Sequence, residues 1–251
     1  MDPTISYQRK LAAEYLDTIG CSATYLHGNP VLPVVPVQTK TGSVMIIGAY
    51  PTAKFATIGR ERDVPVGDID APFSNQTYFD GASVRTVKAG QELAEKYLTQ
   101  LGLAEADLWL TNLVKVFLFK EGHVEKYKRL VSPALESRSR FEEFAKASIP
   151  LLTEEILLAN PKAVILLGEE VTKLLVDGKG PGQKFFDGKP HALKDMDPAI
   201  TAFCLPHPGI VMRPARKQIV DAPPPVDWSK RLETLLPSVR SWLVEQKVLI
   251  P

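Results

Sequence analysis

His207 is the first candidate for chemistry, because Pro206 and Pro208 flank it directly after an apolar run. Proline fixes its own φ angle and restricts the residue before it, so this imidazole is held stiffly. A stiffly held imidazole suits a hydrogen-bond donor that points to where negative charge develops in a reaction. A histidine at the end of a strand also has a purely structural interpretation, which stays open at this point.

Asn112 is the second candidate, because together with Thr111 it interrupts the apolar run of residues 108–116, LWLTNLVKV. A buried amide that lacks a partner costs about 1–3 kcal/mol, so the side chain needs one. The partner is either a nearby main-chain group or a ligand whose polar edge the amide reads at the end of the strand.

The third candidate is the segment of residues 48–51, GAYP, which follows the apolar run VMII. Gly48 frees the backbone and Pro51 cannot pair within a sheet, so a buried strand turns directly into a loop. In open α/β sheets, ligands bind beyond the carboxyl ends of such strands. An ordinary exit from a strand would have the same pattern.

These candidates need a scaffold, and four apolar runs predict buried strands at residues 44–47, 108–116, 163–167 and 200–205. Helical periodicity predicts helices at residues 5–19, 89–102, 141–158, 169–176 and 228–246, with a kink or break at Pro150. This alternation predicts a three-layer α/β/α sandwich with a central, mainly parallel four-stranded sheet. Since the ends of parallel strands meet at one edge, we expect Tyr50, Asn112 and His207 to converge on one cleft.

Residues 52–88 read as a long loop, because glycines and prolines punctuate the segment throughout. Long loops with little regular structure are usually functional or disordered, and the embedded aromatic residues argue against disorder. The rings of Phe73, Tyr78 and Phe79 either attach this loop to the core or stack on a ligand.

Length and composition fit one domain over residues 1–251, with a core at about residues 40–220 and a helix from each terminus packed on it. No apolar run approaches the roughly 20 residues that cross a bilayer, and the polar N-terminus predicts a cytoplasmic protein without a membrane partner. Cys21 and Cys204 are too few for a four-thiolate zinc or iron–sulfur site, so we expect no metal and no cofactor. We also expect a monomer.

At this point four segments resemble the uracil-DNA glycosylase superfamily, over about residues 40 to 220. Residues 48–52, GAYPT, resemble its first motif, a strand followed by Gly-x-x-Pro. The other three resemble its thermostable iron–sulfur branch: residues 111–115, TNLVK, residues 161–168, PKAVILLG, and residues 207–213, HPGIVMR. Residues 89–93, AGQEL, are similar to the start of a helix in that branch.

The resemblance implies an enzyme that flips a damaged base out of DNA and hydrolyses its N-glycosidic bond, so that the base leaves as an anion. His207 would donate a hydrogen bond to the uracil carbonyl where negative charge builds, and Asn112 would pair with the polar edge of the base. Gly48, Ala49 and Pro51 would form part of the base pocket. Phe79, or alternatively Phe73, would stack on the base.

The resemblance also implies how the protein holds DNA. Val211 and Met212 would form an apolar wedge that fills the vacated stack, and Arg213, Arg216 and Lys217 would contact phosphates. Because the net charge is only +1, DNA binding would depend on such a local basic rim rather than on the charge of the whole chain. No lyase activity is implied.

The sequence departs from the family at the first motif, which usually offers Asp, Asn or a nearby Glu to position water or stabilise the sugar cation. Ala49 and Tyr50 stand there instead, and a tyrosine with an ordinary pKa of about 10 is no anionic base at neutral pH. A carboxylate from the long loop would replace it, and Asp68, Asp70 and Asp80 are the candidates. The candidate catalytic residues are therefore His207, Tyr50, Asp68 and Asp70.

Three functions stay open. The favoured interpretation is a DNA base-excision glycosylase that acts on uracil or a related damaged base. The alternatives are a catalytically silent nucleic-acid binder with the same fold, suggested by Ala49 and Tyr50, and a hydrolase for a nucleoside or another small molecule. A basic rim around His207 would favour DNA, and an acidic or closed rim would favour the small substrate.

Overall fold

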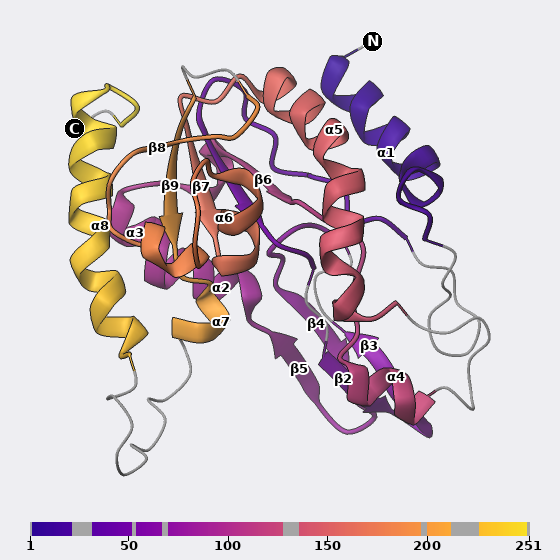
Figure 1. Ribbon diagram of the computed structural model, residues 1–251. Helices are drawn as coiled ribbons and strands as arrows, with labels where there is room; N and C mark the ends of the chain where they lie inside the picture. Colours follow the sequence, from indigo (N-terminus) through magenta and orange to yellow (C-terminus); the bar gives the residue numbers. More distant parts are fainter. Residues whose placement is uncertain are drawn as a thin grey trace. The chain divides into compact units, whose positions relative to one another are not determined.

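The computed structural model describes residues 2–21, 32–51, 54–66, 70–127, 136–196, 200–211 and 226–249. The chain forms two compact units, each built from three segments. The first unit contains Met1–Thr39, Ala49–Gln91 and Leu110–Ala159, and the second contains Lys40–Gly48, Glu92–Trp109 and Asn160–Pro251. Figure 1 shows the helices and strands of the chain. Our expectation of a single domain stays a prediction.

The central element is a five-stranded sheet with the strand order β6-β1-β7-β9-β8. Its strands are β1 (Val44–Gly48), β6 (Leu108–Asn112), β7 (Ala163–Leu167), β8 (His191–Ala192) and β9 (Thr201–Leu205). Strand β7 pairs in parallel with β1 and β9, whereas β8 runs antiparallel to β9. The predicted α/β fold with a mainly parallel sheet is confirmed. Strand β8 was not predicted, because two residues are too few to show a pattern.

The ends of β1, β7 and β9 lie level with one another. Every residue of β1 and β7 is buried, as expected for strands covered on both faces. Gly48 lies opposite Leu167 in the register, and Leu167 lies opposite Leu205. The chain therefore leaves these three strands at one edge of the sheet. Strand β6 ends at Asn112 rather than at Val116, so the amide stands at the strand's carboxyl end.

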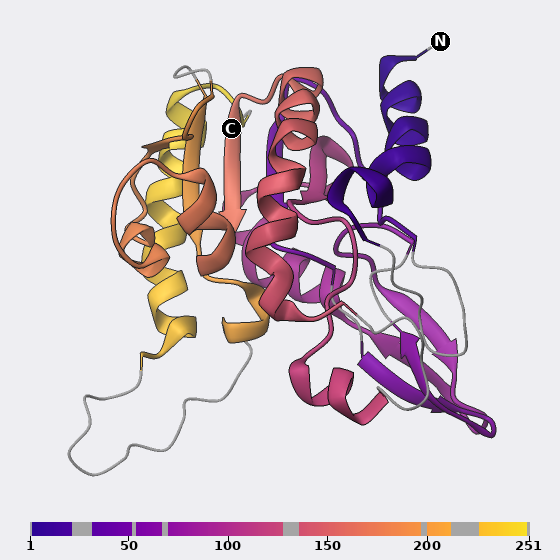
Figure 2. The ribbon, with the colours of Figure 1, turned by 45° about the vertical axis from the view of Figure 1, so that its right-hand side comes forward.

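The second unit surrounds its strands with short and long helices. Helix α8 (Trp228–Glu245) packs against β9 and α3 (Thr99–Leu101), which Figure 2 shows from a second angle. Helix α6 (Glu169–Leu175) follows β7, and α7 (Pro208–Val211) follows β9. The remaining short helices are η3 (Glu105–Asp107) and η5 (Gly182–Phe185). The helices predicted over residues 169–176 and 228–246 are confirmed, each ending one residue earlier.

The helix predicted over residues 89–102 is also confirmed, but it is not uniform. It consists of α2 (Ala89–Leu93), the π-helical η2 (Ala94–Leu98) and α3, and Gly102 ends it in the left-handed conformation at a φ of 74°. A π-helical turn inside a helix often lies near a functional site.

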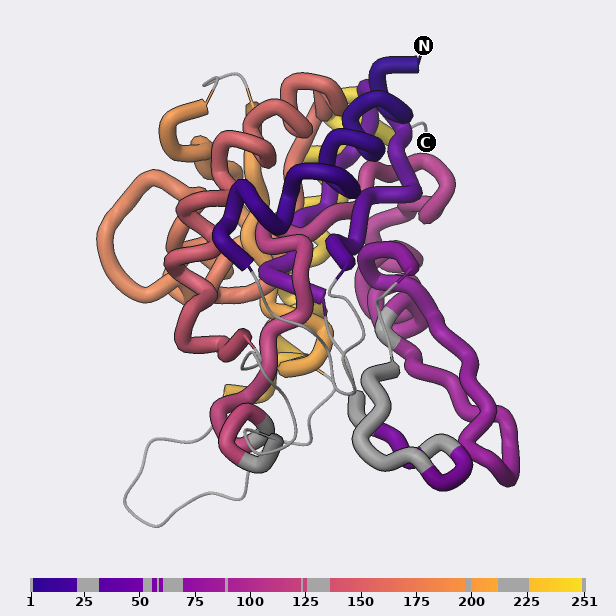
Figure 3. Tube along the Cα trace, turned by 90° about the vertical axis from the view of Figure 1, so that its right-hand side faces the viewer, coloured from indigo at the N-terminus to yellow at the C-terminus, as the bar shows by residue number. Residues whose placement is uncertain are grey.

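The first unit is held together by α1 (Pro3–Ile19), which packs along α5 (Phe141–Ala159), as Figures 1 and 3 both show. The buried side chains of α1 recur every four residues, the spacing of one helix face: Tyr7, Leu11, Tyr15 and Ile19. Helix α5 continues through Pro150 without a break. The unit also contains α4 (Glu121–Tyr127) and η4 (Arg138–Arg140).

The prediction of a loop over residues 52–88 was wrong. This segment forms two antiparallel hairpins, β2 (Lys54–Ile58) with β3 (Glu61–Val66), and β4 (Gln76–Phe79) with β5 (Val84–Val87). The glycines that suggested a loop are in the turns, where Gly59 and Gly81 have φ angles of 61° and 97°. Pro65 is tolerated because a two-stranded sheet consists only of edges. Figure 3 follows β4 and β5 side by side.

Candidate functional site

His207 lies at the edge where β7 and β9 end, next to Gly168. A Cβ atom built on Gly168 would lie 3.4 Å from the Cβ atom of His207, and the φ angle of Gly168 is 112°. That backbone angle is in the range that favours glycine. The turn after β7 therefore passes close to the imidazole, and the sequence signal for it is the glycine that directly follows the strand.

The imidazole of His207 has a defined orientation. Its Nδ1 atom accepts a hydrogen bond of 3.0 Å from the main-chain N–H of Gly209, at the start of α7. A main-chain N–H can only donate, so a neutral imidazole in this position carries its proton on Nε2. The preceding residue is anchored as well, because the hydroxyl of Tyr97 donates to the carbonyl of Pro206 at 2.6 Å. In its neutral form the half-buried ring thus carries its N–H donor on Nε2.

Asn112 is almost completely buried, with 2% of its surface exposed. Its main-chain oxygen accepts a hydrogen bond from Lys115, but its side-chain Nδ2 group has no hydrogen-bond partner in the described structure. A main-chain partner for this donor was the alternative interpretation of the sequence. The N–H protons of the amide therefore have no acceptor in the described structure.

The exits of β1 and β6 are joined within the first unit, because the N–H of Val114 donates to the carbonyl of Ala49 at 2.9 Å. Ala49 is buried, and its side chain is only a methyl group without a polar atom. The ring of Tyr50 lies 5.5 Å from that of Phe141, and the guanidinium of Arg138 lies 5.4 Å from the centre of the Tyr50 ring. These contacts fix the phenol by packing and by a cation–π interaction. Sequence reasoning missed both neighbours, which lie about ninety residues away.

The two phenylalanines predicted as stacking rings occupy different environments. Phe79 is 58% exposed and pairs with Val84 near the tip of the β4–β5 hairpin. Phe73 is 7% exposed, and its φ angle of 58° is unusual for a bulky residue. Its carbonyl faces the start of α2, where a Cβ atom on Gly90 would lie only 2.3 Å away. The β4–β5 hairpin thus lies between Phe73 and α2 along the chain, and the main chain of Phe73 lies next to the start of that helix.

Two of the candidate carboxylates of the long segment, Asp70 and Asp80, lie in its described part and have different surroundings. Asp70 is exposed. Asp80 accepts hydrogen bonds from the N–H groups of Ala82 and Ser83 and from the guanidinium of Arg85. The bond from Arg85, followed by those from the two N–H groups, lowers the pKa of Asp80 to about 2. Asp80 therefore stabilises the turn of its hairpin, and the predicted role of Asp70 stays a prediction.

The structure describes only some of the remaining predicted site residues. Asp68, Met212, Arg213, Arg216 and Lys217 lie outside the described residues. Val211 ends α7 and is buried, and the wedge role predicted for it stays a prediction.

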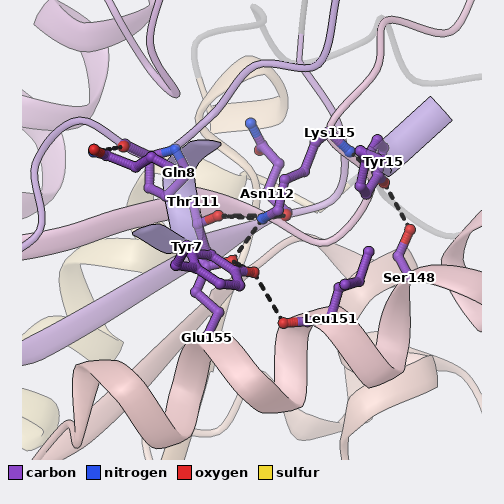
Figure 4. A network of polar contacts seen from close by, with 10 residues as sticks. Tyr7, Gln8, Tyr15, Thr111, Asn112, Lys115, Ser148, Leu151 and Glu155 are labelled. Atoms are coloured by element: carbon purple, nitrogen blue, oxygen red, sulfur yellow. Dashed lines mark hydrogen bonds and ion pairs between the residues drawn. The ribbon is translucent and has the colours of Figure 1, made fainter. Parts of the chain in front are cut away.

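A network of buried polar side chains lies beside Asn112 and was not predicted as a unit. Figure 4 shows its centre, the ion pair between Lys115 of the segment after β6 and Glu155 of α5. The sequence does contain one signal for it, because Lys115 is a lone charge in the apolar run of residues 108–119. Its partner, forty residues away on a helix, gives no such signal.

Other site types find no support in the described part of the chain. No helix there is both long and apolar enough to cross a membrane. No group of three or more histidine, cysteine, aspartate or glutamate side chains is arranged there to hold a metal ion.

Comparison with curated proteins found no match for this chain. Comparison with protein families found one, the uracil DNA glycosylase superfamily, whose model matches residues 36–226. The match includes the exits of β1, β6 and β9, with Tyr50, Asn112 and His207, and it leaves α1 and α8 outside. Because it covers most of the chain, this protein belongs to the uracil-DNA glycosylase superfamily.

Proposed function

We propose that this protein is a DNA base-excision glycosylase that hydrolyses the N-glycosidic bond of uracil or a related damaged base. The observation that supports this most is the unpartnered Nδ2 group of Asn112, which is 2% exposed at the end of a strand. An unpaired buried donor costs about 1–3 kcal/mol, which a ligand carbonyl would recover. A base flipped out of the duplex offers that carbonyl on its pairing edge.

His207 is the proposed electrophile. Its Nε2–H donor would meet the carbonyl oxygen of the base, where negative charge accumulates as the glycosidic bond breaks. The hydrogen bond from Gly209 to Nδ1 supports this role, because it keeps the proton of the neutral ring on Nε2. A neutral donor can stabilise a departing anion without first being protonated from solution.

Phe73 is the proposed stacking ring, in preference to Phe79. An aromatic ring contributes by stacking on the face of the extruded base. The buried position of Phe73 and its positive φ angle fit a ring that the fold holds in one place. Phe79 at its exposed hairpin tip has no comparable support.

The proposal is tested with oligonucleotides that carry one uracil or one hypoxanthine, in single-stranded and duplex form, followed by alkaline cleavage at abasic sites. We expect His207→Ala to lower the excision rate by about 10²–10³-fold, as for other donors that stabilise a developing oxyanion. Asn112→Ala should lower it by about 5- to 150-fold, which corresponds to the cost of 1–3 kcal/mol given above.

The matched control is His191→Ala. His191 lies on β8, and its Nε2 atom forms a hydrogen bond of 3.0 Å with Asp187. This variant should cleave like the parent. If both site variants also cleave like the parent, the assignment of the site is wrong.

A second candidate is a silent nucleic-acid binder, and the first motif favours it. Ala49 brings no polar side chain, and the ring of Tyr50 is engaged by Phe141 and Arg138. A glycosylase normally positions water or stabilises the sugar cation from this motif. Retention of uracil-containing DNA in a gel-shift assay, without cleavage of any lesion by the parent protein, would support this candidate over the enzyme.

A further inference from the structure

Lys115 is buried together with its counter-ion. Its side chain is 1% exposed, and its ammonium lies 2.7 Å from Oε2 of Glu155, which is fully buried. The same ammonium donates to Oγ1 of Thr111 at 2.7 Å and to the main-chain oxygen of Asn112 at 3.0 Å. An ammonium has three protons, so this set of acceptors uses all of them. Figure 4 shows the three contacts.

The carboxylate of Glu155 is in turn held by α1. The hydroxyl of Tyr7 lies 3.1 Å from Oε2 of Glu155 and 2.9 Å from the carbonyl of Leu151, so its single proton serves both acceptors. Burial, followed by the negative charge of Glu155, raises the pKa of Tyr7 well above its usual value. Tyr7 therefore stays a donor at neutral pH, and α1 and α5 together fix the position of the carboxylate.

The main chain of Lys115 is fixed on both sides. Its N–H donates to the hydroxyl of Tyr15 at 2.8 Å, and its carbonyl accepts from the N–H of Val34 at 2.7 Å. The hydroxyl of Tyr15 is itself anchored on Ser148 of α5 at 2.6 Å. From this fixed point the ammonium returns to the carbonyl of Asn112, three residues earlier. This hydrogen bond connects the side chain of Lys115 to the main chain at the end of β6.

We propose that Lys115 and Glu155 are positioning residues for Asn112, which hold its main chain so that the side-chain amide keeps one orientation toward the base. This inference rests on the proposed function. A buried ion pair is weak evidence for stability, because the loss of hydration offsets much of the attraction. The contacts of this pair instead converge on the two residues that end β6, Thr111 and Asn112. A recognition group held to within about 0.5 Å needs such a supporting layer.

The variants are chosen so that the protein still folds. Lys115→Met alone would leave the buried charge of Glu155 without its counter-ion, which is strongly destabilising. The test variant is therefore Lys115→Met/Glu155→Gln, which removes both charges and keeps an acceptor for Tyr7. The control is Lys10→Met/Glu154→Gln. This ion pair joins α1 to α5 at 2.6 Å, and both of its side chains are about half exposed.

The first measurement does not depend on catalysis. In a protein with ¹⁵N-labelled asparagine, the side-chain signals of Asn112 are identified by their loss in Asn112→Ala. We expect one pair of narrow signals from the two amide protons in the parent and the control. In the test variant these signals should be broadened or multiple. An unchanged narrow pair in the test variant overturns the proposal. This result is informative even if the parent protein excises no base.

The second measurement is a double-mutant cycle on uracil-containing DNA. We expect Lys115→Met/Glu155→Gln to lower kcat/KM by about 10- to 100-fold, the scale of a small misplacement of a binding group. In the Asn112→Ala background the same two changes should have little further effect, because residues that act through one another are not additive. An equal loss in both backgrounds would indicate a general structural defect and overturn the proposal.

Discussion

Gly90 and Phe73 show how one missing Cβ atom positions a candidate site residue. The carbonyl of Phe73 comes so close to α2 that any side chain at position 90 would collide with it. The atom in the way belongs to the main chain, so the collision cannot be relieved by a change of rotamer. The backbone on one side or the other would have to move, and with it the ring of Phe73.

We therefore expect Gly90→Ala to lower the free energy of unfolding by about 1–3 kcal/mol, the usual cost of overpacking, despite the helix propensity of alanine. Chemical denaturation of the parent and the variant measures this difference. The control is Gly122→Ala in α4, where a Cβ atom meets nothing within 4 Å. A Gly90→Ala variant as stable as the control would show that the contact with Phe73 is looser than described.

At this scale the sequence indicates single residues better than the partners that hold them. The positions of Asn112 and His207 at strand ends were predicted, because each interrupts or follows an apolar run. The hydrogen bond from Gly209 and the cluster of Arg138 and Phe141 on Tyr50 were not predicted. Such contacts depend on how loops close in three dimensions, and no local pattern encodes them.

At the scale of elements, the β4–β5 hairpin depends on a single carboxylate in its turn. Asp80 receives three hydrogen bonds, and its pKa in the folded chain is about 2, below the ordinary value of 3.8. A depressed pKa means that ionised Asp80 stabilises the hairpin above about pH 4. This contribution is lost as the pH falls from 4 through 2.

We expect the amide proton shifts of Ala82 and Ser83 to titrate with a midpoint near pH 2 in NMR spectra. In Asp80→Asn this titration should disappear, because the variant has no carboxylate in the turn. A midpoint near pH 4 at the two amides would contradict the hydrogen-bonded turn.

Elements with long, regular patterns were predicted well, and short ones were not. The buried strands β1 and β7 and the helices α1, α5 and α8 appear where apolar periodicity placed them. The two hairpins within residues 54–87 were missed because their glycines and prolines dominate the pattern. In β4 and β5 most side chains are exposed or half-buried, so no apolar alternation marks them.

At the scale of the whole molecule, the two units are interleaved along the chain. The chain passes from one unit to the other after residues 39, 48, 91, 109 and 159. Strand β6 and helix α2 each contribute residues to both units. Neither unit can therefore lose its structure without breaking an element of the other. This topology predicts that the molecule unfolds in one cooperative step.

Each unit contains one buried cysteine that tests this prediction. Cys21 belongs to the first unit, and Cys204 of β9 belongs to the second. Thiol reagents attack the thiolate, and burial raises the pKa of Cys204 to about 12, so the folded chain should react very slowly there. Cys204→Ala leaves a reporter for the first unit, and Cys21→Ala leaves one for the second. We expect labelling of both to begin at the same denaturant concentration, coincident with the loss of helical circular dichroism. Two separate midpoints would show two independent domains and contradict the single domain predicted from the sequence.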